Sequence, residues 1–257
     1  MKKCLYLATS LFLISNSYAG YAPGPGVSMS VPAGNRILML QSSFVVPSGL
    51  NIPKLQTVFI WPGLTPSGGK NYLPLNQGVL QPVITHGNSC APHSVSVNNG
   101  WWISGQYVNT SNSRLFPKHG VCLGGEAMEV NPGDNLTTTI EFIDGEWVQT
   151  IADFTKMETT SYTLSLSRLA KTPGITQSQH SAYFVIELPN YKKFPNLRFT
   201  TKFVAISITL KNPDPNFKNS IHTPPGTSCT QAYPEDGSNN KVWRIDSCSV
   251  DSLQPTT

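Results

Sequence analysis

The chain is short of charge. Only 12% of its 257 residues are Asp, Glu, Lys or Arg, roughly half of the share usual in soluble domains. The longest basic run is Lys192-Lys193, and subtracting Lys2 and Lys3, which belong to an expected leader, lowers the formal charge from +4 to +2. Nucleic acid is therefore excluded as an expected partner, because binding to a phosphate backbone relies on clustered Lys and Arg.

Acidic residues are missing from the first half of the mature chain, where none precedes Glu126. Any mechanism with two carboxylates must take both from the second half. Glu141 and Asp144 lie close there, but three residues of straight strand send them to opposite faces. A glycoside hydrolase needs two neighbouring carboxyls. It would have to draw on Glu141, Glu146 or Glu187, and it lacks a clear pair.

Motifs for metals, cofactors and nucleophilic catalysis are also missing. No C-x-x-C pair supports a zinc site, and no G-x-S-x-G turn supports a serine nucleophile. The histidines are scattered without ligand spacing: His86, His93, His119, His180 and His222. We therefore expect neither a metal nor a cofactor.

No hydrophobic run is long enough to cross a bilayer, which takes about 20 residues. The apolar run Cys4–Ile14 follows Lys2-Lys3 and precedes Ser17-Tyr18-Ala19. This order is typical of a secretory signal peptide. We expect residues 1–19 to be such a peptide, cleaved after Ala19, and the mature protein to be secreted to the medium or the periplasm without a transmembrane anchor.

Cysteine is scarce, and loss of Cys4 with the leader leaves an even four. In an oxidising compartment an even set indicates two disulfides. Nearest-neighbour pairing gives Cys90–Cys122 and Cys229–Cys248, although four cysteines allow three connectivities.

Short apolar runs with period-two alternation are abundant, and they are separated by turn residues. The expected strands are 37–46, 55–61, 78–86, 100–108, 136–143, 147–154, 160–166, 182–188 and 203–210. Asp144-Gly145 predicts a type I′ hairpin between two of them, and Asn131-Pro132-Gly133-Asp134 predicts another turn. No helical period of useful length is present. The pattern predicts an all-β protein, an antiparallel two-sheet sandwich.

Composition divides the chain further. Residues 20–211 are expected to form the sandwich domain, in which the Pro/Gly-rich segment 20–35 is a loose lead-in or an edge strand. Residues 212–257 are polar and Pro-rich, and we expect a disulfide-stapled C-terminal extension with one strand at 241–246. This extension lacks the apolar mass for a core of its own.

Aromatic residues mark candidate binding positions. Trp61 ends a strand, and the adjacent Trp101 and Trp102 must point to opposite faces. Exposed rings can stack on sugars or hold a peptide in a groove, so Trp61, Trp101, Trp102 and Tyr107 are candidate substrate-binding residues. Packing inside the sandwich is the alternative for each tryptophan.

Five segments, in their order along the chain, resemble the glutamic peptidases (eqolisins) and secreted fungal relatives of that sandwich. They are VFIWPGL, GVLQPVITHG, GWWISGQYV, EWVQTIADFT and AYFVIELPN, and the resemblance runs from about Val58 to Leu210. It implies a concanavalin-A-like jelly roll in which the catalytic glutamine is Gln81 and the catalytic glutamate is Glu187. Glu187 would be the general base that activates water, and the Gln81 amide would donate to the developing oxyanion. The two side chains are then expected on neighbouring strands, within hydrogen-bond or one-water reach.

The chain also departs from the peptidases. Where they carry a Trp-Tyr-Glu-Trp strand, this sequence has Trp101-Trp102-Ile103-Ser104, and Gln81 is followed by Pro82. Our leading hypothesis is a monomeric, secreted acid endopeptidase acting on polypeptide. The alternative is a non-catalytic sandwich that binds carbohydrate or a surface partner.

Overall fold

The structure is a computed structural model of the chain, and it describes residues 26–53, 56–66, 78–91, 100–109, 121–165, 178–189 and 197–252. The expected signal peptide, residues 1–19, lies outside these ranges. Within them, no helix has the length and apolar character needed to cross a bilayer.

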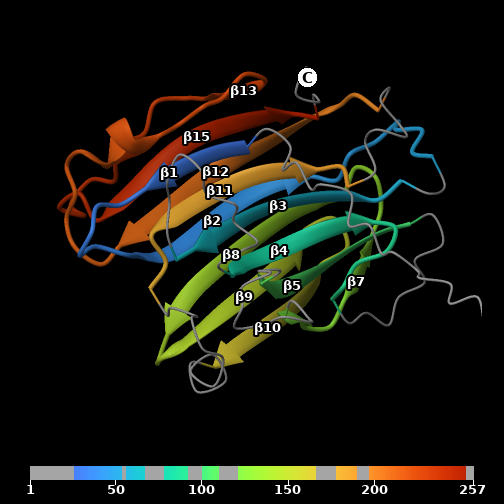
Figure 1. Cartoon of the computed structure of the whole chain (residues 1–257), viewed down its shortest axis with the longest axis horizontal. Coiled ribbons are helices and arrows are strands. Elements are labelled where there is room, and N and C mark those ends of the chain that lie inside the picture. Colours follow the sequence, from blue (N-terminus) through green and yellow to red (C-terminus); the bar gives the residue numbers. More distant parts are fainter. Residues whose placement is uncertain are drawn as a thin grey trace, which may run out of the picture.

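Two antiparallel sheets stacked face to face make up the fold (Figure 1). Sheet A has the order β1-β11-β3-β4-β5-β6, and β7 also pairs with β5. Its strands are β1 (Gly26–Ser30), β3 (Val58–Thr65), β4 (Val79–His86), β5 (Trp101–Asn109), β6 (Val121–Gly124), β7 (Met128–Val130) and β11 (Ser181–Glu187). The all-β, two-sheet sandwich expected from the sequence is thereby confirmed.

Sheet B has the order β10-β9-β8-β2-β12-β15-β13, and β14 also pairs with β15. Its strands are β2 (Ile37–Val45), β8 (Asn135–Ile143), β9 (Glu146–Asp153), β10 (Glu158–Ser165), β12 (Thr200–Leu210), β13 (Thr227–Cys229), β14 (Tyr233–Pro234) and β15 (Val242–Asp251). One 3₁₀-helix, η3 (Phe217–Ser220), precedes β13.

The strands and turns expected from the local sequence are present. All nine expected strands occur, and β3 shows the largest change of bounds, from 55–61 to Val58–Thr65. Asp144 and Gly145 have φ of 50° and 84°, as a type I′ turn requires. Asp134 N donates to Asn131 O at 3.0 Å, which confirms the second turn.

The segment after residue 211 contributes to the sandwich. β15 lies beside β12 in sheet B, seen in red in Figure 1, and it places Trp243, Ile245 and Val250 in the core. This strand is longer than the expected 241–246. Alternation of apolar and polar residues along Val242–Asp251 explains why it can bury one face against sheet A.

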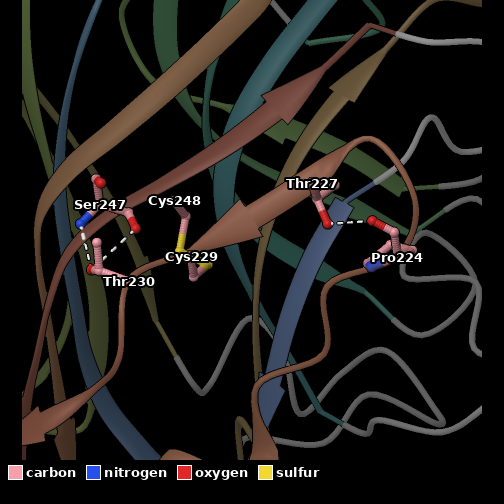
Figure 2. The surroundings of a disulfide bond; sticks show 6 residues. All are labelled: Pro224, Thr227, Cys229, Thr230, Ser247 and Cys248. Atoms are coloured by element: carbon pink, nitrogen blue, oxygen red, sulfur yellow. Dashed lines mark hydrogen bonds between the residues drawn. A yellow bond between two sulfur atoms is a disulfide. The ribbon is translucent and has the colours of Figure 1, made fainter.

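Both expected disulfides are present, Cys90–Cys122 and Cys229–Cys248. Cys229 lies directly opposite Cys248 in the β13–β15 ladder. Figure 2 shows this bond and the hydrogen bonds on either side of it, from Thr227 Oγ1 to Pro224 O at 2.7 Å and from Ser247 N to Thr230 Oγ1 at 3.1 Å. The edge strand β13 is therefore held to β15 covalently as well as by its ladder.

Sheet A is buried on both faces. On its core face, side chains such as Ile60, Leu80 and Phe184 join the main hydrophobic cluster between the sheets. The opposite face, here called the outer face, carries a second cluster of Trp61, Val79, Val83 and Val185. Every residue of β4 is buried as a result, including the polar Gln81, Thr85 and His86.

Residues 87–91, here called the strap, follow β4 and are tied to β6 by the Cys90–Cys122 disulfide. His86 ends β4 opposite Trp101, whereas Cys122 lies opposite Val108, near the other end of β5. Trp102 Nε1 donates to Gly87 O at 3.1 Å, which fixes the start of the strap.

The two sheets approach closely at Gly105. The side chain of Gln149 from sheet B reaches the backbone of β5, where its Nε2 donates to Gln106 O at 2.9 Å and its Oε1 accepts from Gln106 N at 3.1 Å. A Cβ on Gly105 would lie 2.8 Å from Cβ of Tyr162 and 3.0 Å from Cβ of Gln149. Glycine is thus required by the spacing of the sheets.

Gly105→Ala is therefore expected to lower the free energy of unfolding by about 1–3 kcal/mol, the usual cost of overpacking a core. Gly100→Ala is the matched control, because nothing lies within 4 Å of a Cβ built there. Its effect should stay within about 0.5 kcal/mol. Urea unfolding followed by tryptophan fluorescence measures both variants, and equal stability of the two would contradict the close approach.

Candidate functional site

The predicted polar pair lies on the outer face of sheet A. Glu187 on β11 is opposite Phe59 of β3, and Phe59 is opposite Thr85 of β4. Side chains two residues apart on a strand share a face. Thr85 and Gln81 are four apart on β4, so Gln81 and Glu187 point to the same side of the same sheet.

The two side chains are nevertheless far apart, and the expectation that they lie on neighbouring strands is wrong. β3 lies between β11 and β4. The β3–β4 register places Gly63, not Phe59, opposite Gln81. Gln81 and Glu187 are thus offset by four residues along the strand direction and by two strand spacings across the sheet. Their Cα atoms lie roughly 16 Å apart, which is beyond the reach of one shared water.

Tyr183 occupies the position across β3 from Gln81. It pairs with Gly63 in the β11–β3 ladder. A Cβ on Gly63 would lie 2.9 Å from two ring atoms of Trp61, so the Trp61 indole covers this glycine. Burial raises the pKa of Tyr183 to about 12, and its phenol is neutral at any physiological pH.

Among the described residues, three buried polar atoms on this face have no hydrogen-bond partner: Trp61 Nε1, Gln81 Oε1 and Thr85 Oγ1. Their side chains are 1%, 5% and 0% exposed. An unsatisfied buried polar group lowers the stability of the folded protein by about 1–3 kcal/mol. Three such groups on one face therefore destabilise the protein at a single place. Groups of this kind are what a ligand's own donors and acceptors can satisfy.

Glu187 adds a neutral carboxyl to the same face. The residue is 4% exposed, and desolvation raises the pKa of its carboxyl to about 8. No Lys, Arg or Asp occurs within β11, β3, β4 or β5, and Glu187 is the one carboxyl there. The central part of the outer face is therefore uncharged below pH 8.

The four aromatic candidates separate between the two faces. Trp61 and Trp102 lie on the outer face, both 1% exposed. Trp101 and Tyr107 belong to the core cluster, and the Trp101 ring packs 5.2 Å from that of His86. The prediction that Trp101 and Tyr107 contact substrate does not fit this placement, because adjacent strand residues alternate and these two face the core.

The other two chemistries considered from the sequence are metal binding and glycoside hydrolysis. Within the described ranges, no group of three His, Cys, Asp or Glu could hold a metal ion. Glu146 lies opposite Ile143 in the β8–β9 ladder, two residues from Glu141, so Glu141 and Glu146 are diagonal neighbours on one face of sheet B. Glu187 lies in sheet A and is not brought to either of them. Sequence reasoning missed Thr85, although its even spacing from Gln81 on an expected strand was a signal that the two share a face.

Comparison with known proteins gives the fold. No family model matches the chain, and no curated protein matches it. A solved structure of scytalido-glutamic peptidase with a peptide-based transition state analogue superposes with a TM-score of 0.51 at 11% identity, covering 88% of this chain and 99% of that one. A second structure of scytalido-glutamic peptidase, with a transition state analogue inhibitor, gives 0.49 at 12% identity, covering 87% and 97%.

The eqolisin SCP-B, solved with the tripeptide Ala-Ile-His, gives a TM-score of 0.47 at 11% identity, covering 88% of this chain and 99% of that one. At such identities a likeness speaks for the fold alone. The chain therefore has a glutamic-peptidase-like β-sandwich fold.

Proposed function

We propose that this protein binds an extended, uncharged segment of polypeptide on the outer face of sheet A. The observation that carries the proposal is the set of unpartnered buried atoms Trp61 Nε1, Gln81 Oε1 and Thr85 Oγ1 on that face. A peptide backbone offers one donor and one acceptor per residue. It can therefore satisfy an indole N–H, an amide oxygen and a hydroxyl together.

The spacing of these groups favours a chain over a compact ligand. Gln81 and Thr85 are four residues apart on β4, which is about 13 Å along the strand. An extended peptide of four or five residues spans this distance. The neutral Glu187 carboxyl, two strands from Thr85, offers a further donor below pH 8. The solved structure of scytalido-glutamic peptidase with a peptide-based transition state analogue, which shares this fold, supports the choice of a polypeptide.

Carbohydrate fits this face less well. Sugar stacking needs the flat face of an aromatic ring, and Trp61 and Trp102 are each 1% exposed. Contact of either kind of ligand with this face requires the segments that cover it to move, and the unpartnered backbone-type donors and acceptors favour a polypeptide. The two disulfides support an oxidising compartment, and together with the expected signal peptide they lead us to place the protein outside the cell.

Thr85→Val tests the proposal, because valine has nearly the shape of threonine and lacks the hydroxyl. Removing an unsatisfied buried hydroxyl should raise the free energy of unfolding of the free protein by about 1–3 kcal/mol. The same change should weaken binding of a reduced, carboxymethylated protein, since one hydrogen bond to the chain is lost. Urea unfolding and biolayer interferometry measure the two effects.

Thr139→Val in sheet B is the matched control, because Thr139 is half-buried and lies on the other sheet. Binding should be unchanged in this variant. If Thr85→Val binds as well as the wild type, the outer face is not where the polypeptide lies.

A second candidate function is hydrolysis of the bound chain, with Glu187 as general base and Gln81 as oxyanion donor. It is favoured by the fold and by the position of both residues on one face. It requires the roughly 16 Å between them to be closed, either through the substrate or through a change of structure. With a pKa of about 8, Glu187 gains its basic form as pH rises toward 8, so a base role predicts rising activity over that range.

If hydrolysis occurs, Glu187→Gln should reduce it by about 10²–10⁴-fold and Gln81→Ala by about 10²–10³-fold. Cleavage of a reduced, carboxymethylated protein from pH 2 to 9 is followed by release of amines, with serine, cysteine and metal inhibitors present throughout. Wild-type protein that leaves this substrate intact at every pH removes the peptidase candidate and leaves the binding proposal standing.

The raised pKa of Glu187 also predicts how stability depends on pH. Between the ordinary pKa of 4.5 and the folded value of about 8, the unfolded chain loses this proton and the folded protein keeps it. The contribution of Glu187 to the free energy of unfolding should therefore be largest below pH 4.5 and fall toward pH 8, by up to about 1.4 kcal/mol per pH unit. Glu187→Gln should lack this fall and exceed the wild type in stability at pH 8. Denaturant titrations across this range that show parallel profiles for the two proteins would contradict the burial of a neutral carboxyl.

A further inference from the structure

A separate cavity of about 310 Å³ lies in the C-terminal part of sheet B. It opens between η3, the residues of β14 and the start of β15, and the side chains that matter for recognition are those of Lys218, Gln231, Tyr233, Asn240 and Trp243. Its volume is at the small end of ligand pockets, which run from about 300 to 1,000 Å³. A single small ring is the size of ligand that fits.

The cavity has a fixed aromatic lining. Trp243 is 1% exposed, its Nε1 donates to Asn240 O at 3.1 Å, and its ring packs 5.6 Å from that of Phe217. Tyr233 is 48% exposed, and its hydroxyl donates to Asp246 Oδ1 at 2.9 Å. An exposed phenol ring held in this way is available for stacking on a ligand without a large loss of side-chain entropy.

Two side-chain amides in the lining are available to a ligand. The backbone carbonyl of Asn240 is already used by Trp243 and by Asp214 N, and φ of 51° and 57° at Asn239 and Asn240 shapes this turn. The side chains of Gln231 and Asn240 make no hydrogen bond to any part of the chain that the structure describes. Each amide can donate to and accept from hydroxyl groups.

Lys218 sets the charge of the cavity. The neighbouring Arg244 is paired with Glu235, and the Asp246 carboxylate accepts the Tyr233 hydroxyl. Lys218 has no ion pair within the described residues, and it is exposed on η3. Lys218 is the one charged residue among those that line the cavity, which favours an anionic group on the ligand.

We propose that this cavity binds a small acidic sugar of the hexuronic acid class, with its carboxylate on Lys218, its hydroxyls on the Gln231 and Asn240 amides, and its ring against Tyr233. A charge-assisted contact to the carboxylate and amide contacts to hydroxyls are the groups such a ligand needs. This site is independent of the outer face of sheet A, and neither proposal rests on the other.

Isothermal titration of the purified protein with D-glucuronate, alongside D-glucose as the uncharged probe, tests the proposal. D-glucuronate should bind saturably at low ionic strength and more weakly in high salt, and D-glucose should bind at least about tenfold more weakly. Lys218→Gln should weaken D-glucuronate binding about tenfold or more. Lys202→Gln, which removes an exposed lysine from β12 outside the cavity, should leave it unchanged.

A Tyr233→Ala variant is a second test. It removes the stacking surface and leaves Lys218 in place, and it should also weaken D-glucuronate binding. Circular dichroism confirms that each variant is folded. The proposal is overturned if D-glucuronate shows no saturable binding up to tens of millimolar, if D-glucose binds equally well, or if Lys218→Gln and Lys202→Gln bind alike.

Discussion

The double hydrogen bond between the Gln149 side chain and the backbone of Gln106 holds the two sheets in one relative position. Gln149 is fully buried, so losing either bond would leave a polar group unsatisfied inside the core. Gly105, next to Gln106, permits the close approach. Gln106 in turn lies opposite Gln81 in the β4–β5 ladder. The Gln149–Gln106 contact lies on the core side of β5. By fixing the position of β5 it also helps to fix the neighbouring strand β4, which carries Gln81 on the outer face.

Local sequence was sufficient for much of this fold. Alternation located the strands, Asp144-Gly145 located a hairpin through its positive φ, and the even cysteine count led to both disulfides. These signals depend on residues close together in the chain. The short strands β6 and β13 had no comparable signal, because three or four residues carry too little alternation.

The candidate site was harder to predict, since it depends on register between strands that are distant in sequence. The resemblance to the glutamic peptidases brought Gln81 and Glu187 together, and the structure places both on the outer face of sheet A. Their separation depends on how β3 pairs with β4 and β11, and a shift along a ladder leaves no trace in either strand alone. The same limit applies to Trp101 and Trp102. Alternation requires them to diverge but does not say which one meets the core.

The strap at residues 87–91 links the outer face to the redox state of the surroundings. Cys90 is exposed, so small thiols can reach the Cys90–Cys122 bond without the protein unfolding. With the bond reduced, Cys90 loses its covalent tie to β6, while the hydrogen bond from Trp102 Nε1 to Gly87 O still holds the start of the strap. An oxidising environment is thus needed to keep the strap tied covalently to β6.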